Sequence, residues 1–222
     1  MPDPNGEKSA AASEALKLVK NGMVLGLGTG TTFEVFLDLL SEKVKQGLKI
    51  SGVPSSERTA VRARERGITI LAEPREIDLT VDGADEFDDH LFLIKGGGGA
   101  LMREKVVAAN SRHVCIIVDS SKYNGSGIGR FPVPVEISKF LSRHTMKKIE
   151  KLGCRCTLRD DGRFLTDNGN QIADCKFDSV PDPVRLESQI KSIPGVLEVG
   201  LFTSINWEVI MGTKSGVKTF RK

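Results

Sequence analysis

Short apolar stretches typical of β-strands alternate with helical patterns along the first part of the chain, and this order constrains the fold more than any other feature. Strands separated by helices favour βαβ units and a mostly parallel sheet covered by helices on both faces. We therefore predict a Rossmann-like α/β domain. The expected strands are 23–28, 49–53, 68–71, 78–83, 91–94 and 113–119, and the expected helices are 7–20, 33–44, 56–66 and a stretch after the glycines at 96–99.

The pattern changes after about residue 132. A strand, a helix, two strands joined by Asp-Gly and Asn-Gly turn signals, a helix and the strand 196–202 follow one another. That β-α-β-β-α-β order is typical of the ferredoxin-like unit. We predict a small α+β domain over 132–203, and a Rossmann-like catalytic domain made of 1–131 plus about 204–222, whose last residues return to the large sheet.

Composition excludes several classes of protein. Hydrophobic content of 39% and charged content of 27% are ordinary for a globular protein. The net charge of +3 is scattered and aromatic residues make up only 5%, which argues against nucleic-acid binding but allows a small anionic ligand. No apolar run approaches the roughly 20 residues of a membrane span, and the first residues lack the apolar core of a signal peptide. We expect a cytoplasmic protein without membrane contact.

The cysteines suggest buried thiols rather than a metal site. Cys154 and Cys156 form a C-x-C pair, while Cys115 and Cys175 lie in apolar strand-like runs. A zinc site would need two such pairs, or one pair with spaced histidines, and the chain has three scattered histidines. We expect no metal.

The stretch GLGTGTT, residues 26–32, follows a strand and precedes a helix. Glycines at such a place let backbone N–H groups point at an anion, and the hydroxyls of Thr29, Thr31 and Thr32 add donors beside Gly30. A dinucleotide site is disfavoured, because Thr31 stands where the third glycine should be and no acid ends the next strand. A phosphate cradle without a cofactor is expected, with a purely structural turn as the alternative. Thr31 and Glu34 also have the spacing of a capping box.

Two acidic residues, Asp82 and Asp85, follow another strand in the stretch DGADEFDD. The small residues Gly83 and Ala84 between them would let both carboxylates line one pocket and bind sugar hydroxyls. We expect the other acids of this stretch, Glu86, Asp88 and Asp89, to be solvated loop charges.

The stretch KGGGGALMREK, residues 95–105, contains four consecutive glycines. Gly96, Gly97 and Gly98 could expose successive N–H groups to an anion, next to Lys95. Glu104 would lie about one turn into the following helix, where the helix dipole favours negative charge. A carboxylate beside such donors suits proton abstraction next to a carbonyl. The alternative is that Arg103, Glu104 and Lys105 form an exposed charged face.

These motifs occur together, in order, in one known family. GLGTGTT, VDGADEFD, IKGGGGALMREK, VDSSK, LTDNGN and IPGVLEVGLF resemble the motifs of type A ribose-5-phosphate isomerase over nearly the whole chain. The resemblance implies interconversion of D-ribose 5-phosphate and D-ribulose 5-phosphate in the non-oxidative pentose phosphate pathway. It also implies no cofactor or metal, and a homodimer or a dimer of dimers.

The resemblance also suggests roles for individual residues. Glu104 matches the catalytic base, and Asp82, Asp85 and Lys95 match residues near the chemistry. The substrate-binding segments would be Thr29–Thr32, Asp82–Asp85 and Lys95–Gly98, together with Lys122 at the end of VDSSK. Lys8, in the first helix, is a further candidate for a phosphate contact.

Two other functions are compatible with parts of the pattern. A phosphosugar-sensing module would keep the phosphate cradle but would need no base, and Glu104 with Lys95 argues against it. An enzyme like the acyl-CoA transferases would use a glutamate as a nucleophile, but the chain is short for binding CoA.

Overall fold

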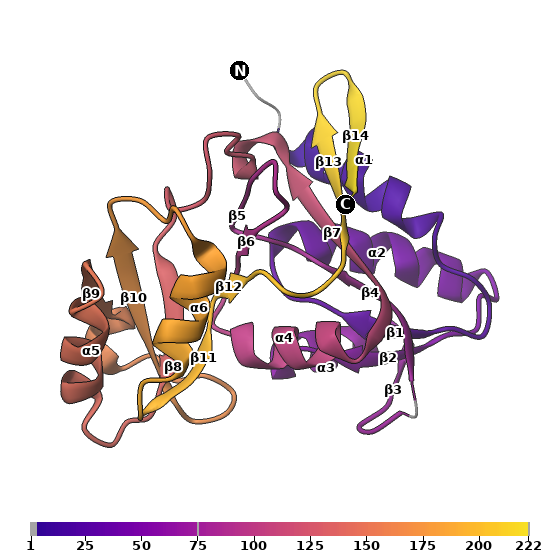
Figure 1. Cartoon of the computed structure of the whole chain (residues 1–222). Helices are drawn as coiled ribbons and strands as arrows, with labels where there is room; N and C mark the ends of the chain where they lie inside the picture. Colours follow the sequence, from indigo (N-terminus) through magenta and orange to yellow (C-terminus); the bar gives the residue numbers. More distant parts are fainter. Residues whose placement is uncertain (1–3, 75, 222) are drawn as a thin grey trace. The chain divides into compact units, whose positions relative to one another are not determined.

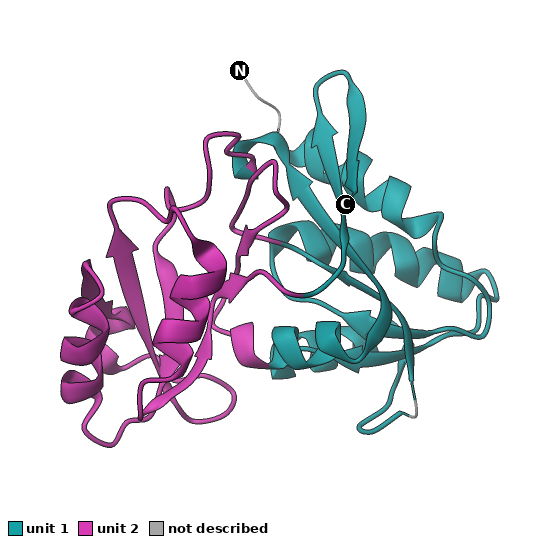
Figure 2. Cartoon of the chain, in the orientation of Figure 1, with its two compact units in different colours: residues 1–83, 103–122, 205–222 teal, residues 84–102, 123–204 magenta. Residues whose placement is uncertain are grey.

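The computed structural model of the protein describes residues 4–74 and 76–221 (Figure 1). The chain forms two compact units (Figure 2). The first comprises residues 1–83, 103–122 and 205–222, and the second comprises 84–102 and 123–204. These compact units do not define independently folding domains, so the domain boundaries at 132 and 203 stay predictions.

The first unit is built on a seven-stranded sheet with the order β14-β13-β7-β4-β1-β2-β3. Every neighbouring pair is parallel except β13 and β14, which form an antiparallel hairpin at the edge. The predicted Rossmann-like sheet is confirmed. Its strands are β1 (Val24–Leu27), β2 (Ser51–Pro54), β3 (Thr69–Ile70), β4 (Ile77–Asp82), β7 (Ser111–Asp119), β13 (Glu208–Thr213) and β14 (Gly216–Arg221).

Helices cover both faces of this sheet. Successive side chains of a strand point to opposite faces, so each face carries apolar side chains that a helix can bury. Leu25 and Leu27 of β1 point into the main core, which they share with α1 (Pro4–Leu16), α2 (Thr31–Lys45) and α3 (Glu57–Glu65). Gly26, between the two leucines, points to the opposite face. A Cβ atom on Gly26 would lie 2.7 Å from Val107 of α4 (Leu101–Ala109). Helix α4 therefore packs closely against that second face.

The second unit contains a four-stranded antiparallel sheet with the order β11-β8-β10-β9. Along the chain its elements run β8, α5, β9, β10, α6 and β11, which confirms the predicted ferredoxin-like order. A second, three-stranded sheet has the order β12-β6-β5. The elements are β5 (Glu86–Phe87), β6 (Leu93–Ile94), β8 (Val133–Ile137), α5 (Ser142–Glu150), β9 (Cys154–Leu158), β10 (Gln171–Phe177), α6 (Pro183–Lys191), β11 (Val196–Val199) and β12 (Leu201–Phe202), with short 3₁₀ turns η1 (Ser120–Lys122) in the first unit and η2 (Arg159–Gly162) in the second.

Two strands predicted for larger sheets belong elsewhere. The stretch 91–94 contributes only β6, which pairs with β5 and β12. The stretch 196–202 is divided into β11 and β12 because Gly200 changes partners: its N–H donates to the carbonyl of Pro134 and its own carbonyl accepts from the N–H of Lys95. Such a change of hydrogen-bonding partners leaves no trace in hydrophobic periodicity.

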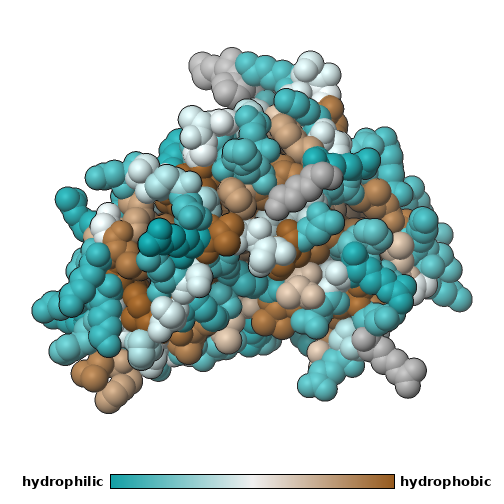
Figure 3. Space-filling model, viewed as in Figure 1, coloured by the Kyte–Doolittle hydropathy of each residue, from teal (hydrophilic) through white to brown (hydrophobic). Residues whose placement is uncertain are grey.

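Hydrophilic residues cover most of the face that Figure 3 shows, and hydrophobic residues appear there in small groups. The most exposed large hydrophobic side chains in the described part of the chain include Phe140 and Leu141, in the turn before α5. Among the described residues, no helix is both long and apolar enough to cross a membrane.

Candidate active site

The loops that carry the predicted site residues of the first unit lie at the carboxyl edge of the parallel sheet. Gly28 and Thr29 follow β1, Asp82 ends β4, and η1 follows β7. Because these strands are parallel and adjacent, their carboxyl ends lie along one edge, which is where open α/β sheets bind ligands. The N–H of Gly28 donates to the carbonyl of Val81 across 3.0 Å, which joins the first loop to the end of β4.

Asp82 is buried at this edge and organises the first loop. One of its oxygens, Oδ1, accepts from the N–H of Thr29 at 3.0 Å and from its neighbour Gly83 at 2.7 Å. A Cβ atom on Gly28 would lie 2.2 Å from that oxygen. Glycine at 28 is therefore needed for the close approach of the loop to the Asp82 carboxylate.

The Thr29 hydroxyl takes part in a buried group of hydroxyls. It lies 2.9 Å from Ser55 Oγ, 3.0 Å from Ser56 Oγ and 3.2 Å from Thr59 Oγ1, at the start of α3. Thr59 in turn donates to the carbonyl of Gly28. These contacts attach the loop after β1 to the start of α3. Sequence reasoning missed Ser55, Ser56 and Thr59 because they carry no motif of their own.

Helix α2 begins without the predicted capping box. Gly30, with φ of 118°, is the N-cap residue, and no side chain caps the helix. Thr31 is already the first helical residue, and its hydroxyl accepts from Lys8 Nζ at 2.9 Å. Glu34 pairs instead with Arg62 of α3. The capping prediction was wrong because both side chains have partners outside the helix.

Helix α1 holds the loop that carries Lys122. Glu7 is buried, and its Oε2 accepts from both the N–H and the hydroxyl of Ser120, at 3.0 and 2.7 Å. The next residue, Lys8, reaches Thr31 of the first loop. Adjacent residues of α1 therefore bind two of the predicted phosphate-contacting loops. The role of Glu7 was missed, since a lone glutamate in an alanine-rich helix gives no signal.

Glu104 lies in the first turn of α4 and is 3% exposed. It shares the buried side of the helix with Val107 and Ala108, three and four residues further on. Its neighbour Arg103 pairs at 2.7 Å with Glu57 in the first turn of α3, and that hydrogen bond lowers the pKa of Glu57. Glu104 is therefore not part of an exposed charged face.

The direction of α4 places Glu104 at the carboxyl edge. Along the chain, helix α4 comes after β4 and before β7, and these two strands are parallel. The helix must therefore run antiparallel to them and start at their carboxyl ends. The ion pair between Arg103 and Glu57 agrees with this, because α3 also follows a carboxyl end, that of β2.

The second unit contains the other predicted residues. The N–H of Gly97 donates to Asp85 Oδ2 at 2.7 Å, so the structure brings these two motifs together. Lys95 is buried, with its Nζ 5.4 Å from the centre of the Phe202 ring. The turn is closed by a hydrogen bond from Gly99 to Gly96, whose φ of 103° favours glycine.

Arg159 is a supporting residue that sequence reasoning missed. Its Nη1 donates to the carbonyls of Gly96 and Gly97, at 3.0 and 3.1 Å. Its guanidinium donates two hydrogen bonds to the carboxylate of Asp174 in a bidentate ion pair. Because both carbonyls are bound from one side, the orientation of the peptides in the glycine turn is fixed.

Two acids predicted to be solvated are buried. Glu86 is fully buried and accepts from three backbone N–H groups at 129–131 and from the Asn124 amide. Asp88 accepts from the N–H groups of His90 and Phe92, and burial raises its pKa. Only Asp89 of the three is exposed. The prediction was wrong for Glu86 and Asp88 because their backbone partners are created by the fold.

Comparison with known proteins identifies the family. The family model of ribose 5-phosphate isomerase A (phosphoriboisomerase A) matches residues 51–216. The chain is 50% identical to ribose-5-phosphate isomerase A of Picrophilus torridus over 96% of each chain, and 47% identical to that of Brucella suis over 97% of each.

Solved structures agree with this. A D-ribose-5-phosphate isomerase in complex with phospho-erythronic acid superimposes with a TM-score of 0.95 at 38% identity, over 99% of this chain and 100% of that one. The Methanocaldococcus jannaschii ribose 5-phosphate isomerase A gives a TM-score of 0.91 at 39% identity, over 97% and 98%. The chain therefore belongs to the ribose 5-phosphate isomerase A family.

Proposed function

We propose that the chain interconverts D-ribose 5-phosphate and D-ribulose 5-phosphate through an enediolate, with Glu104 as the general base. The observation that carries the proposal is the buried carboxylate of Glu104 in the first turn of α4, at the carboxyl edge of the sheet. Membership of the family supports the substrate and the reaction. We also propose the non-oxidative pentose phosphate pathway as its setting, and a cytoplasmic homodimer or dimer of dimers, as the family implies.

The proposed chemistry assigns one task to each group of residues. Glu104 removes the proton from C2 of the open-chain aldose and returns it to C1. Lys95 and the N–H groups of Gly96 and Gly98 stabilise the negative charge that develops on the oxygen at C1, while the N–H of Gly97 holds Asp85. Asp82 and Asp85 accept hydrogen bonds from sugar hydroxyls and take part in moving the proton between the two oxygens.

The phosphate would bind where α2 begins. Gly30, Thr31 and Thr32 form the N-terminus of that helix, where N–H groups and the helix dipole favour an anion. Lys8 and Lys122 add positive charge, Lys8 through its contact with Thr31. A solved member of the family binds phospho-erythronic acid, a phosphorylated acid, which supports an anionic ligand here.

The proposal is tested by measuring ketose formation from ribose 5-phosphate. An isomerase converts the aldose to ribulose 5-phosphate without any second substrate. A sensing module would bind ribose 5-phosphate and leave it unchanged. A CoA-transferring enzyme would neither bind nor convert it. Binding without conversion would contradict the proposed function.

Isomerase activity is expected to survive removal of metal ions. The proposed mechanism uses only side chains and backbone N–H groups of the chain, so no step needs a cation. The measurement is ketose formation after exhaustive chelation and dialysis, beside an untreated sample. A loss of activity that added zinc or magnesium restores would contradict the mechanism.

Replacing Lys122 with alanine is expected to weaken phosphosugar binding about 10- to 100-fold, because a hydrogen bond to a charged group contributes roughly 1.5–3 kcal/mol. The measurement is the dissociation constant of a competitive phosphosugar inhibitor. Lys49→Ala is the matched control, since Lys49 is exposed and precedes β2 at the opposite edge of the sheet. Equal affinity in the Lys122→Ala variant and the control would remove Lys122 from the site.

A further inference from the structure

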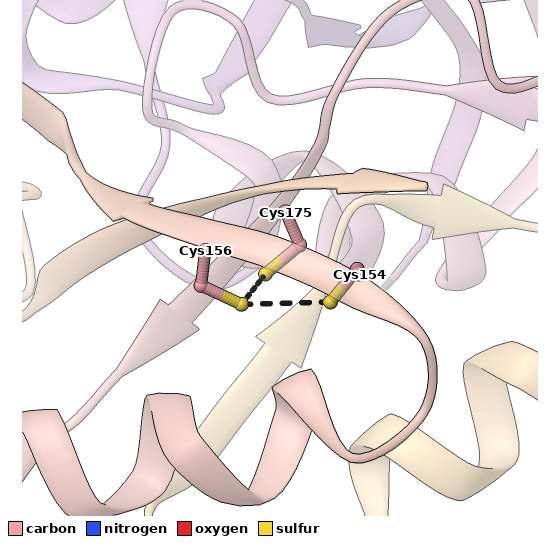
Figure 4. Close-up of side chains that lie close together, drawn as sticks. All are labelled: Cys154, Cys156 and Cys175. Carbon is pink, nitrogen blue, oxygen red and sulfur yellow. Dashed lines mark hydrogen bonds between the residues drawn. The ribbon is translucent and has the colours of Figure 1, made fainter. Parts of the chain in front are cut away.

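Three cysteines that have no role in the proposed reaction come together in the second unit. Cys154 and Cys156 lie two positions apart on β9, so their side chains project from the same face of the sheet. Cys175 of β10 is paired directly with Cys156 in the antiparallel register. Figure 4 shows the three sulfur atoms converging from the two strands. All three are free thiols.

The sulfur atoms are close enough to share one ion. Cys156 Sγ is 2.9 Å from Cys175 Sγ and 3.6 Å from Cys154 Sγ, and all three atoms lie within 4.8 Å of one another. With a metal–sulfur bond of about 2.3 Å, three sulfurs arranged trigonally around an ion lie about 4 Å apart. The closest pair would have to open by about 1 Å, which side-chain rotation at the two cysteines can supply.

The sulfur atoms are largely buried, but one of the three cysteines is partly exposed to solvent. Cys175 is fully buried and Cys156 is 9% exposed, within an apolar core that includes Ile149. Cys154 is only partly buried, which leaves a route from solvent to the sulfurs. Glu150, the last residue of α5, lies beside the group, and its Oε1 accepts from the N–H of Cys156 at 3.2 Å.

The number of sulfur ligands distinguishes between zinc and Cu(I) as the bound ion. Within the described residues, the group of metal-binding side chains contains these three cysteines and no histidine, aspartate, glutamate or fourth cysteine. A structural zinc ion requires four ligands in a tetrahedron. Soft thiolate ligands also select Cu(I), which is stable with three sulfurs alone. We propose that Cys154, Cys156 and Cys175 form a three-coordinate binding site for Cu(I).

The sequence favoured buried thiols over a metal site because a zinc site would need a second cysteine pair or spaced histidines. The pairing of Cys175 with Cys156 follows only from the strand register. The alternative is that the three thiols are small apolar side chains that fill the core. A packing role predicts no selective binding of a thiophilic ion. The two explanations therefore differ in a property that can be measured.

The test is a titration of the reduced protein with Cu(I) in the absence of oxygen, in competition with a chromophoric Cu(I) chelator. We expect one ion per chain to resist the chelator, with three sulfur neighbours in the X-ray absorption spectrum. The variants Cys154→Ser, Cys156→Ser and Cys175→Ser are each expected to bind Cu(I) on the order of 100-fold more weakly, since even an outer-shell partner contributes 10- to 100-fold. Alanine variants at the same positions repeat the test if a buried serine impairs folding, which circular dichroism would show.

Cys115→Ser is the matched control, because Cys115 is also a buried free thiol but lies on β7 in the first unit. It should bind Cu(I) as the wild type does. Copper binding that survives loss of Cys154, or that is lost in the Cys115 variant, would overturn the proposal. So would the absence of tight Cu(I) binding, or tight zinc binding through a fourth ligand in preference to Cu(I).

Discussion

Replacing Glu104 with glutamine is expected to lower kcat on the order of 10²–10⁴-fold, which is the usual contribution of a general base. The amide keeps the shape of the side chain but cannot take the proton from C2. The other groups assigned to the substrate, Lys95, Gly96–Gly98 and Lys122, are unchanged, so the variant should bind ribose 5-phosphate nearly as well as the wild type. Steady-state kinetics and a direct binding measurement together check both expectations.

Glu65→Gln is the matched control for this variant, because Glu65 is an exposed glutamate at the end of α3. Its kcat should equal that of the wild type. If Glu104→Gln keeps near-normal turnover, Glu104 is not the base. If it loses binding but keeps turnover at saturation, Glu104 is a ligand contact, and Asp82 and Asp85 become the candidates for the base.

Replacing Glu86 with glutamine is expected to destabilise the protein by roughly 2–5 kcal/mol, the range for leaving buried groups without their partners. Each carboxylate oxygen of Glu86 accepts two hydrogen bonds: Oε1 from Asn124 and the N–H of Arg130, and Oε2 from the N–H groups of Gly129 and Phe131. An amide nitrogen in place of either oxygen would face two donors. Urea denaturation measures the change in the free energy of unfolding.

Asp89→Asn provides the comparison for Glu86→Gln. Asp89 belongs to the same acidic stretch but is exposed, and among the described residues it accepts from the Tyr123 hydroxyl alone, at 2.6 Å. Its replacement should change the free energy of unfolding by less than about 1 kcal/mol. Equal effects in the two variants would contradict the view that the Glu86 carboxylate anchors the segment 129–131.

The large sheet could be predicted because its signals are local. The central strand β7 contains the apolar run VCIIV, and β1 is rich in leucine and valine. The intervening helices carry their own period of 3.6 residues, as at Phe33, Phe36, Leu37 and Leu40. The loops at the carboxyl edge could also be found, because glycines and acids directly after a strand are unusual. Local pattern therefore predicted the α/β sheet and the position of the candidate site along the chain.

Residues whose partners lie far away in the sequence could not be predicted. Glu86 and Asp88 look like loop charges until the fold supplies N–H groups around them. Arg159 supports a glycine turn more than sixty residues earlier. Cys175 joins the C-x-C pair only through strand register. In each case the pairing is decided by topology rather than by composition or spacing.

The central claim is that Glu104 moves the proton between C2 and C1, and hydrogen exchange at C2 tests this most directly. Wild-type protein and the Glu104→Gln variant are incubated with ribose 5-phosphate in D₂O, and deuterium in the sugar phosphates is followed by NMR. We predict exchange of the C2 hydrogen with the wild type and none above background with the variant, at substrate concentrations that saturate both. Exchange at a comparable rate in the Glu104→Gln variant would contradict the claim, because another group would then be the base.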